Sequence, residues 1–270
     1  MHRGPRPWLI AAALALTSCA PRVQLPQGTE APDRDLVLHD HSLRLHFANA
    51  NAPSARPLLI FATGDGGWHR KDLDAWRHLA SWGYPIVGFD ARDYVTHLGS
   101  DVDTTTPEGL AQDYATIIDS ARAALGVSPE RPIVLVGVSR GAGLSVVAAG
   151  DAQLRPEISG VLAVALTREE EYVKWYRRVP PRERRADAAV MVQLYEYLPQ
   201  LDDTPVSVVQ STRDKYLPAG EARLLFGPDT PNRRFEPIEA SNHSFGGARD
   251  DLYRAMSQAL DWIEGLLPPR

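Results

Sequence analysis

The sequence predicts an α/β fold in which a mostly parallel central sheet is covered by helices on both faces. Short apolar runs alternate along the chain with longer segments of helical periodicity, which is the order of elements in a parallel sheet with crossover helices. The run 133–138 is apolar throughout, as expected for a strand buried on both faces. The 270 residues, of which 44% are hydrophobic, suit one domain with a sizeable core.

The first predicted elements form one side of this sheet. Apolar and polar side chains alternate over 36–47, which indicates one or two edge strands. The short apolar run 57–62 predicts a buried strand. Residues 73–82 have helical periodicity and are followed by Gly83, a residue typical of helix ends, and 85–89 predict the next strand.

The later elements continue the alternation. The apolar side chains of 107–125 recur with helical spacing, which predicts an amphipathic helix before the strand at 133–138. The remaining predicted elements are a helix at 142–149, strands at 158–166, 206–210 and 233–238, and a closing helix at 248–267.

Residues 167–204 interrupt the alternation of strands and helices. The stretch is long, charged and rich in aromatic residues, and it contains Pro180 and Pro181. We therefore expect one domain over 36–270, with a cap-like insert at about 167–204 that shapes the functional site.

The first residues have the features of a secretory signal. Arg3 and Arg6 precede an apolar run over 8–16, and small residues follow that run. The run is shorter than the roughly 20 residues that a membrane-spanning helix needs. We therefore expect export from the cytoplasm.

Residues 16–19, Leu-Thr-Ser-Cys, resemble a bacterial lipobox, in which the cysteine is lipidated and becomes the first mature residue. On this interpretation 1–19 are a lipoprotein signal, and Cys19 carries an acyl lipid such as palmitate. The alternative is an ordinary signal cut after Ala20. In enterobacterial sorting a residue other than aspartate after the cysteine favours the outer membrane, so we expect a periplasmic protein anchored there. The composition of 20–35 predicts a flexible tether.

The composition argues against several function classes. The net charge of -5 and a pI of about 5.9 argue against a general nucleic-acid-binding protein, which needs a basic surface. Cys19 is the single cysteine, so neither an intramolecular disulfide nor a cysteine-rich metal site can form. The histidines lack metal-ligand spacing and no P-loop motif is present. We therefore expect no metal and no cofactor.

The segment 137–141 reads Gly-Val-Ser-Arg-Gly and fits the G-x-S-x-G motif. It follows a predicted strand and opens a predicted helix, which is where the nucleophile of α/β hydrolases lies on a strained turn. Ser139 is therefore the candidate nucleophile, and the N–H of Arg140 is a candidate donor to an oxyanion. The alternative is a glycine-lined turn with an idle serine.

A serine nucleophile needs a base within hydrogen-bonding distance, and the base needs a carboxylate to orient it. In the α/β-hydrolase fold the chain order is serine, acid, histidine. His243 follows the last predicted strand and is the only histidine after Ser139, and Asp214 follows the strand at 206–210. Both should therefore lie at the same sheet edge as the serine. The competing carboxylates, none of them directly after a strand, are Asp202, Asp203 and Asp229.

The strand at 57–62 leads into a glycine-rich turn, 63–68. In α/β hydrolases a turn at this point supplies the second oxyanion N–H, which we assign to Asp65, with Gly66 as the alternative. The other interpretation is a plain surface turn. The carboxylate of Asp65 would either bind a cationic group of the substrate or cap the following helix.

The segment 64–68, Gly-Asp-Gly-Gly-Trp, resembles the glycine-rich loop of the VirJ/AcvB family of bacterial virulence proteins. Further segments continue the likeness from about residue 57 to 265, namely Gly88-Phe89-Asp90, Thr106-Pro107-Glu108 with Asp113, the G-x-S-x-G motif and Asn242-His243. The resemblance implies a periplasmic protein linked to type IV secretion and to hydrolysis of lysyl-phosphatidylglycerol. The family often has phenylalanine after the serine, where this chain has Arg140, and that departure leaves the substrate open.

Basic and aromatic residues are interleaved in the insert. The basic residues are Lys174, Arg177, Arg178, Arg182, Arg184 and Arg185, and the aromatic ones are Tyr172, Trp175 and Tyr176. Such a cluster suits an anionic headgroup or a membrane surface, although the preceding glutamates also allow a solvated helix with internal ion pairs. The expected substrate contacts are Asp65, Trp68, Tyr172, Trp175 and Arg177.

These features predict a serine hydrolase that cleaves an ester at the bacterial envelope, with an aminoacylated phospholipid as the implied substrate. One alternative is a non-catalytic envelope protein that supports a secretion or virulence assembly by binding. A second alternative keeps the enzyme but makes it a carboxylesterase, an acyltransferase or a peptidase acting on another substrate. The sequence names no protein partner.

Overall fold

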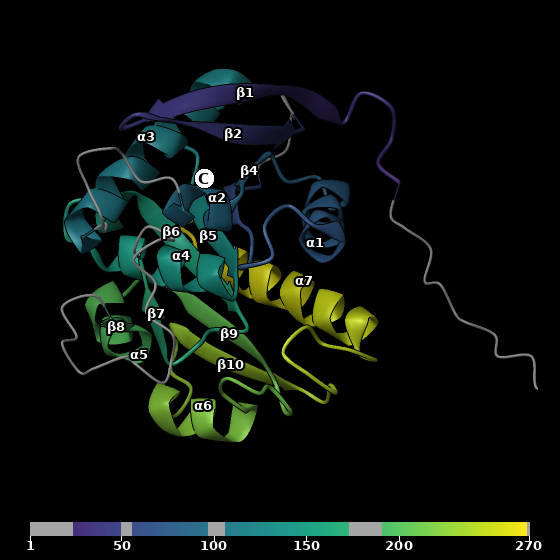
Figure 1. The fold of residues 1–270 in the computed structure, drawn as a ribbon, viewed down its shortest axis with the longest axis vertical. Coiled ribbons are helices and arrows are strands. Elements are labelled where there is room, and N and C mark those ends of the chain that lie inside the picture. The colour runs from purple at the N-terminus through teal and green to yellow at the C-terminus, as the bar shows by residue number, and fades with distance from the viewer. Residues whose placement is uncertain (1–23, 50–55, 97–105, 173–190, 269–270) are drawn as a thin grey trace, which may run out of the picture.

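The computed structural model describes residues 24–49, 56–96, 106–172 and 191–268. Within these ranges the chain forms an eight-stranded sheet with helices on both faces (Figure 1). The predicted lipidation site, Cys19, lies outside the described residues. In the described part of the chain every helix is too short or too polar to cross a membrane.

The sheet has the strand order β1-β2-β4-β3-β5-β6-β9-β10. The strands are β1 (Glu30–Leu38), β2 (His41–Ala48), β3 (Leu58–Ala62), β4 (Ile86–Phe89), β5 (Ile133–Val138), β6 (Ile158–Val164), β9 (Val206–Ser211) and β10 (Arg233–Ile238). Strands β4, β3, β5, β6, β9 and β10 pair in parallel, whereas β2 is antiparallel to both of its neighbours. The predicted mostly parallel sheet is confirmed, and the carboxyl ends of its parallel strands meet at one edge.

Helices bury an apolar layer on each face of the sheet. The described helices are α1 (Arg70–Ser81), α2 (Ala91–Thr96), α3 (Pro107–Leu125), α4 (Arg140–Gly150), α5 (Leu194–Tyr197), α6 (Ala219–Phe226) and α7 (Arg249–Gly265), with short 3-10 turns at η1 (Arg155–Glu157) and η4 (Leu198–Leu201). Side chains of α2 to α6 belong to one core cluster, and those of α1 and α7 to the other. Figure 1 shows α1 and α7 together on the right of the molecule.

Successive side chains of the central strands belong in turn to the two core clusters. In β3, Leu58 and Ile60 face one cluster while Leu59 and Phe61 face the other, and all four are fully buried. Successive side chains of a strand point to opposite faces, so a strand covered on both sides is apolar at each position. This is why the run at 57–62 predicted the strand within one residue.

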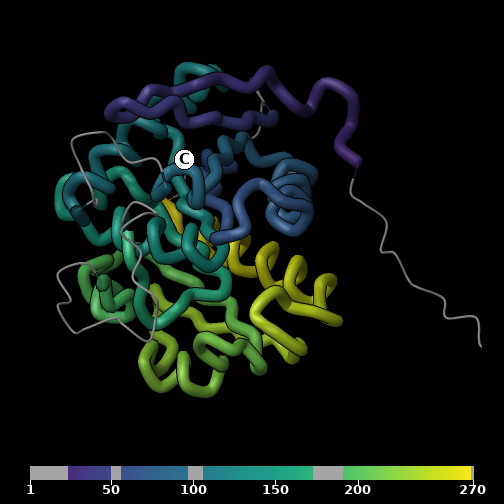
Figure 2. Tube along the Cα trace, in the orientation of Figure 1, coloured from purple at the N-terminus to yellow at the C-terminus, as the bar shows by residue number. Residues whose placement is uncertain are grey.

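The N-terminal hairpin corrects one boundary. We predicted a tether over 20–35, but β1 begins at Glu30 and pairs with β2 along its length. The residues of β1 are mostly exposed and the register shifts between Ala31 and Arg34. Backbone hydrogen bonds to β2 hold this polar edge strand, so its side chains do not show the apolar pattern that reveals buried strands. Figure 2 traces the hairpin, in purple, along one edge of the molecule.

The insert is less separate than predicted. Its described part forms a small two-stranded sheet, β7 (Glu169–Glu171) with β8 (Met191–Gln193), followed by α5 and η4. Leu194 and Leu198 are buried in the core cluster that contains α4. The residues from 191 onward therefore pack on the domain itself. We did not predict the short helix α2, which follows β4 directly.

Candidate active site

Ser139 lies on the turn between β5 and α4. Its backbone has φ 52° and ψ -113°, a conformation that L-residues other than glycine rarely adopt. The N–H of Ser139 donates to Val164 at the end of β6, and the N–H of Gly141 donates to Thr63 at the end of β3. The turn is thus fixed to both neighbouring strands, and the predicted strained turn between strand and helix is observed.

The two glycines of the motif are required by close backbone approach. A Cβ at Gly137 would lie 2.1 Å from the carbonyl oxygen of Gly141, and a Cβ at Gly141 would lie 2.2 Å from that of Ala62. Real Cβ atoms do not approach backbone oxygens this closely. The sharp turn therefore depends on the absence of side chains at both positions.

We expect Gly141→Ala to lower the free energy of unfolding by about 3 kcal/mol or more, because β3 and α4 must separate to admit the methyl group. The measurement is a urea unfolding curve at constant m-value. The control is Gly220→Ala in α6, where nothing lies within 4 Å of the new Cβ; it should stabilise by about 0.5 kcal/mol. Equal unfolding midpoints for the two variants would contradict the packing argument.

The structure brings Ser139, His243 and Asp214 into one chain of hydrogen bonds. His243 Nε2 lies 2.9 Å from Ser139 Oγ, and His243 Nδ1 lies 2.6 Å from Asp214 Oδ2. The serine follows β5, the aspartate follows β9 and the histidine follows β10. The three residues therefore meet at the carboxyl edge of the parallel strands, as the chain order predicted.

The hydrogen bonds of the imidazole define its tautomer. A carboxylate oxygen only accepts, so Nδ1 carries the proton that it donates to Asp214. Nε2 is then the acceptor for the hydroxyl proton of Ser139. The side chain of His243 is 17% exposed whereas that of Asp214 is fully buried. The imidazole is thus partly accessible, while the carboxylate behind it is shielded from water.

The carboxylate of Asp214 is held by residues that sequence reasoning missed. Oδ1 accepts from the N–H of Tyr216 at 2.8 Å, and Oδ2 also accepts from Gln210 Nε2 at 3.1 Å. Gln210 is fully buried in β9 and donates in addition to the carbonyl of Leu217 at 2.6 Å. The sequence signal for this contact was an amide that directly follows the apolar pair Val208-Val209 of the strand. Gln210 ties the acid loop to the sheet.

The competing aspartates lie elsewhere. Asp229 pairs with Arg223 at 2.5 Å. Asp202 ends the turn η4 with a positive φ, and Asp203 is exposed beside it.

Tyr216 packs edge-on against the imidazole of His243 with ring centroids 4.8 Å apart. The loop after β9 therefore supports both the carboxylate of Asp214 and the imidazole of His243.

The glycine-rich loop after β3 reaches Ser139, because a Cβ on Gly64 would lie 3.6 Å from the Cβ of the serine. The N–H of Gly64 donates to Asp72 Oδ1 at 2.9 Å, and the N–H of Gly67 donates to the carbonyl of Gly64. Those two donors serve the loop itself. The predicted oxyanion donors of this loop are the N–H groups of Asp65 and Gly66, which lie between Gly64 and Gly67.

The N–H of Arg140 is the other predicted donor. Arg140 is the first residue of α4, and the first N–H groups of a helix have no acceptor within the helix. They also carry the positive end of the helix dipole. Asp72, which accepts from the Gly64 N–H, is buried, and burial raises the pKa of its carboxyl; the Gly64 N–H and the charge of Arg249 oppose that rise.

The side chain of Asp65 is paired within the protein. Its Oδ1 accepts from Arg140 Nε at 2.8 Å. The N-cap residue of the next helix, α1, is His69, whose side chain makes no capping hydrogen bond; the alternative in which Asp65 caps this helix stays a prediction. Burial lowers the pKa of Arg140, but the charges of Glu170 and Asp65 outweigh burial and raise it, so the guanidinium is charged.

Trp68 was predicted to contact the substrate and instead anchors the loop. Its ring stacks on His46 with centroids 4.3 Å apart and covers Gly88, where a Cβ would lie 2.6 Å from the indole. The backbone N–H of Trp68 donates to Asp90 Oδ2 at 2.8 Å. The motif Gly88-Phe89-Asp90 thus provides the space and the acceptor for Trp68, and Trp68 is not among the residues that line the cavity at Ser139.

Two of the predicted insert contacts, Trp175 and Arg177, lie outside the described residues, as does the basic cluster. Tyr172 is buried rather than facing the substrate, because it packs on α4 where Gly143 leaves room. Burial raises the pKa of its hydroxyl well above the ordinary value. The prediction failed because an aromatic residue in a charged stretch gives no sign of which side it faces.

A cavity of about 1040 Å³ opens beside Ser139 and His243. Its carboxylates come from Asp65 and Asp72 and from Glu169 to Glu171 of β7, and its cations come from Arg70, Lys71, Arg140, Arg168 and Arg249. The apolar side chains of Val138, Val164, Leu252 and Met256 complete the lining. The cavity therefore offers apolar surface together with charges of both signs.

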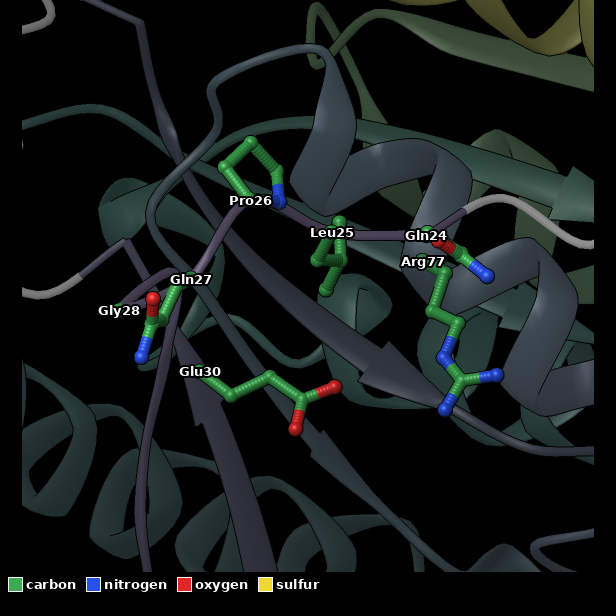
Figure 3. Close-up of a pocket in the computed structure, with 7 residues that line it drawn as sticks. All are labelled: Gln24, Leu25, Pro26, Gln27, Gly28, Glu30 and Arg77. Atoms are coloured by element: carbon green, nitrogen blue, oxygen red, sulfur yellow. The ribbon is translucent and has the colours of Figure 1, made fainter.

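A smaller hollow of about 510 Å³ lies where the described chain begins. Figure 3 shows Gln27, Glu30 and Arg77 around it, with Leu25 beside them. Leu25 also packs against the core cluster of α1 and α7. This hollow shares no lining residue with the cavity at Ser139. The described residues contain no cluster of three or more His, Cys, Asp or Glu side chains that could hold a metal ion.

A family model described as "Bacterial virulence protein (VirJ)" matches residues 57–196. No curated protein matches the chain. The matched region contains the glycine-rich loop and the turn at Ser139, whereas Asp214 and His243 lie beyond it. The family match thus includes the predicted nucleophile and both predicted oxyanion segments.

Solved structures share the architecture. Est1E from Butyrivibrio proteoclasticus is 16% identical with a TM-score of 0.62, covering 87% of this chain and 100% of its own. The esterase Pf2001 of Pyrococcus furiosus is 15% identical with a TM-score of 0.60, covering 85% of this chain and 89% of its own. These similarities show the α/β-hydrolase fold, and they confirm the predicted fold class.

Proposed function

This chain belongs to the VirJ family of bacterial virulence proteins, and from that membership together with the geometry around Ser139 we propose that it is a serine ester hydrolase of the bacterial envelope. One observation carries the proposal: a hydroxyl, an imidazole and a buried carboxylate are joined by hydrogen bonds of 2.9 and 2.6 Å at the edge of the sheet. A serine held this way has the base that a weak nucleophile needs.

The proposed reaction has two steps. Ser139 Oγ attacks the ester carbonyl while its proton passes to His243 Nε2, and the tetrahedral intermediate expels the alcohol, which takes that proton. Water then attacks the acyl-enzyme, gives a proton to His243 and releases the carboxylic acid as Ser139 regains its proton. Asp214 keeps the imidazole in the productive tautomer and stabilises the imidazolium.

The backbone donors of Arg140 and of Asp65 or Gly66 stabilise the oxyanion in this proposal. Arg140 opens α4, so the helix dipole favours negative charge at its N–H. The loop that carries Asp65 is fixed at Gly64 by Asp72 and at Trp68 by Asp90. Donors held in place before the reaction need no reorganisation when the charge develops.

The charges of the cavity suit an ester that carries both a cation and an anion. Carboxylates of β7 lie on its lining, and Arg70, Lys71 and Arg249 supply positive charge. An aminoacylated phospholipid such as lysyl-phosphatidylglycerol has an ammonium group, a phosphate and an aminoacyl ester, and it is the substrate we propose. A lipid on Cys19 would keep the domain near such a substrate at the periplasmic face of the outer membrane.

The proposed chemistry is tested with a fluorophosphonate probe. The purified protein should be labelled at neutral pH, peptide mapping should place one adduct on Ser139, and heat-denatured protein should not react. A protein that resists labelling at any pH would favour the alternative, a non-catalytic envelope protein that binds and supports a secretion or virulence assembly.

The proposed substrate is tested with vesicles that contain lysyl-phosphatidylglycerol. Free lysine and phosphatidylglycerol should appear together, and water labelled with ¹⁸O should enter the lysine carboxylate. Transfer of the lysyl group to another acceptor would identify an acyltransferase. A probe-reactive protein that leaves this lipid intact would retain the esterase and lose the proposed substrate.

A further inference from the structure

We infer that the side chain of Arg140 is a positioning group that clamps the glycine-rich loop 63–68 to the insert. Through this contact β7 helps to set the geometry of catalysis. The inference rests on the proposed function for its catalytic consequence. The physical coupling between the loop and the insert does not depend on that function, and hydrogen–deuterium exchange measures it directly.

Arg140 uses its whole guanidinium to join three segments. Nε donates to Asp65 Oδ1 at 2.8 Å, Nη1 donates to the carbonyl of Glu171 at 2.9 Å, and Nη2 lies 3.0 Å from Glu170 Oε1. The arginine itself starts α4, beside the nucleophile. One side chain therefore connects the turn at Ser139, the loop after β3 and the first strand of the insert.

Because the side chain of Arg140 is buried, the loss of one of its partners would affect the others. The side chain of Arg140 is 5% exposed and that of Glu170 is 14% exposed. A buried guanidinium that loses a partner must move toward another acceptor or toward water, because an unpaired buried charge is costly. Asp65 is the partner most able to follow, since its own side chain is 54% exposed.

The clamp acts on the part of the loop that matters for catalysis. Gly64 is held by Asp72 and Trp68 is held by Asp90, so both ends of the loop are fixed independently of the insert. Asp65 lies between these points, and its N–H is the proposed oxyanion donor. A displacement of about 1 Å in a positioned group can cost roughly a hundredfold in rate, so a loosened Asp65 would weaken catalysis without removing any reacting group.

The arginine geometry is specific. A planar fork donates in several fixed directions at once, whereas a lysine ammonium is a point charge on a flexible stem. Arg140→Lys should therefore retain the charge and lose part of the connection.

The experiment compares Glu170→Gln and Arg140→Lys with the control Glu157→Gln. Glu157 accepts from Arg122 at 2.9 Å and lies before β6, at the amino end of the parallel strands. The control therefore removes a carboxylate charge from a more exposed arginine pair, in which Glu157 is 45% exposed, away from the site. Hydrogen–deuterium exchange of the peptide spanning 63–68 should be about tenfold faster in Glu170→Gln and Arg140→Lys than in wild type. In the control it should be unchanged.

The catalytic consequence is measured with p-nitrophenyl acetate, whose acyl group is small. We expect kcat to fall about tenfold in Glu170→Gln and further in Arg140→Lys, with KM within twofold of wild type. A direct contact between Glu170 and substrate would instead raise KM for large cationic esters and spare this one, and that result would overturn the inference, as would unchanged exchange. If the wild type were inactive but the peptide 63–68 still exchanged faster in Glu170→Gln, the proposed function would be overturned. The coupling between the loop and the insert would then be upheld.

Discussion

Ser139→Ala should lower kcat for ester hydrolysis by roughly a millionfold, because the reaction loses both the nucleophile and the proton that His243 accepts. Water would have to attack the ester directly, assisted only by the oxyanion donors and by binding. KM should change little, since the cavity loses a single oxygen atom. The measurement is p-nitrophenyl ester hydrolysis at high enzyme concentration, with wild type assayed alongside.

The same variant should fold normally. Ser139 already has a Cβ at its positive φ, so alanine adds no strain, and the substitution removes the hydrogen bond between its hydroxyl and His243. The matched control is Ser145→Ala in α4, the helix that follows Ser139; Ser145 is a buried serine that pairs with Tyr114. That variant should keep its activity within twofold. Ester hydrolysis retained by Ser139→Ala and lost in Ser145→Ala would refute the assignment of the nucleophile.

In cells, the Ser139→Ala variant separates catalysis from binding. A strain lacking the protein and complemented with wild type should contain less aminoacylated phospholipid than one complemented with Ser139→Ala. Equal amounts would reject the phospholipid as the substrate. A phenotype rescued equally by both forms would indicate an assembly role that needs no chemistry.

The elements that the sequence predicted well are those whose burial follows a clear pattern, on both faces of a strand or along one face of a helix. The run 133–138 and the amphipathic segment 107–125 correspond to β5 and α3 residue for residue. The helix α3 also has strong end signals, because Thr106 caps it and Gly126 ends it in the left-handed conformation. Apolar patterns and capping residues can be seen directly in the amino-acid sequence, so these boundaries can be predicted from it.

Elements held mainly by backbone contacts were harder to predict. The polar strand β1 is held by its ladder to β2, and the three-residue strands β7 and β8 pair outside the main sheet. Neither has an apolar pattern with a recognisable period. Secondary structure that depends on a neighbour rather than on its own side chains cannot be predicted from local sequence.

The hydrogen-bonded chain at the site was predictable because the fold constrains it. Loops that follow parallel strands meet at one edge, so the position of Asp214 and His243 after their strands was enough to place them near Ser139. The partners of these groups were not predictable in the same way. Gln210 and Glu170 contact the site through three-dimensional packing, and nothing in their spacing along the chain shows it.

Asp214→Asn should lower kcat by about ten-thousandfold with the fold intact, because an amide cannot replace a carboxylate behind the imidazole. The amide can donate to His243 Nδ1 and so favour the tautomer with the proton on Nε2. That nitrogen would then donate and could not accept the proton of Ser139. The developing imidazolium would also lose its counter-charge. The measurement is kcat for a p-nitrophenyl ester, with the unfolding midpoint as the check on folding.

The surroundings of Asp214 make either orientation of the asparagine unfavourable. The N–H of Tyr216 points at Oδ1, while Gln210 Nε2 and His243 Nδ1 both point at Oδ2. Asparagine has one oxygen, so its amide nitrogen must face a donor on one side or the other. The exposed aspartate Asp203 provides the control, and Asp203→Asn should keep full activity. If both variants lost activity equally, or if Asp214→Asn stayed within tenfold of wild type, Asp214 would not be the residue that orients the base.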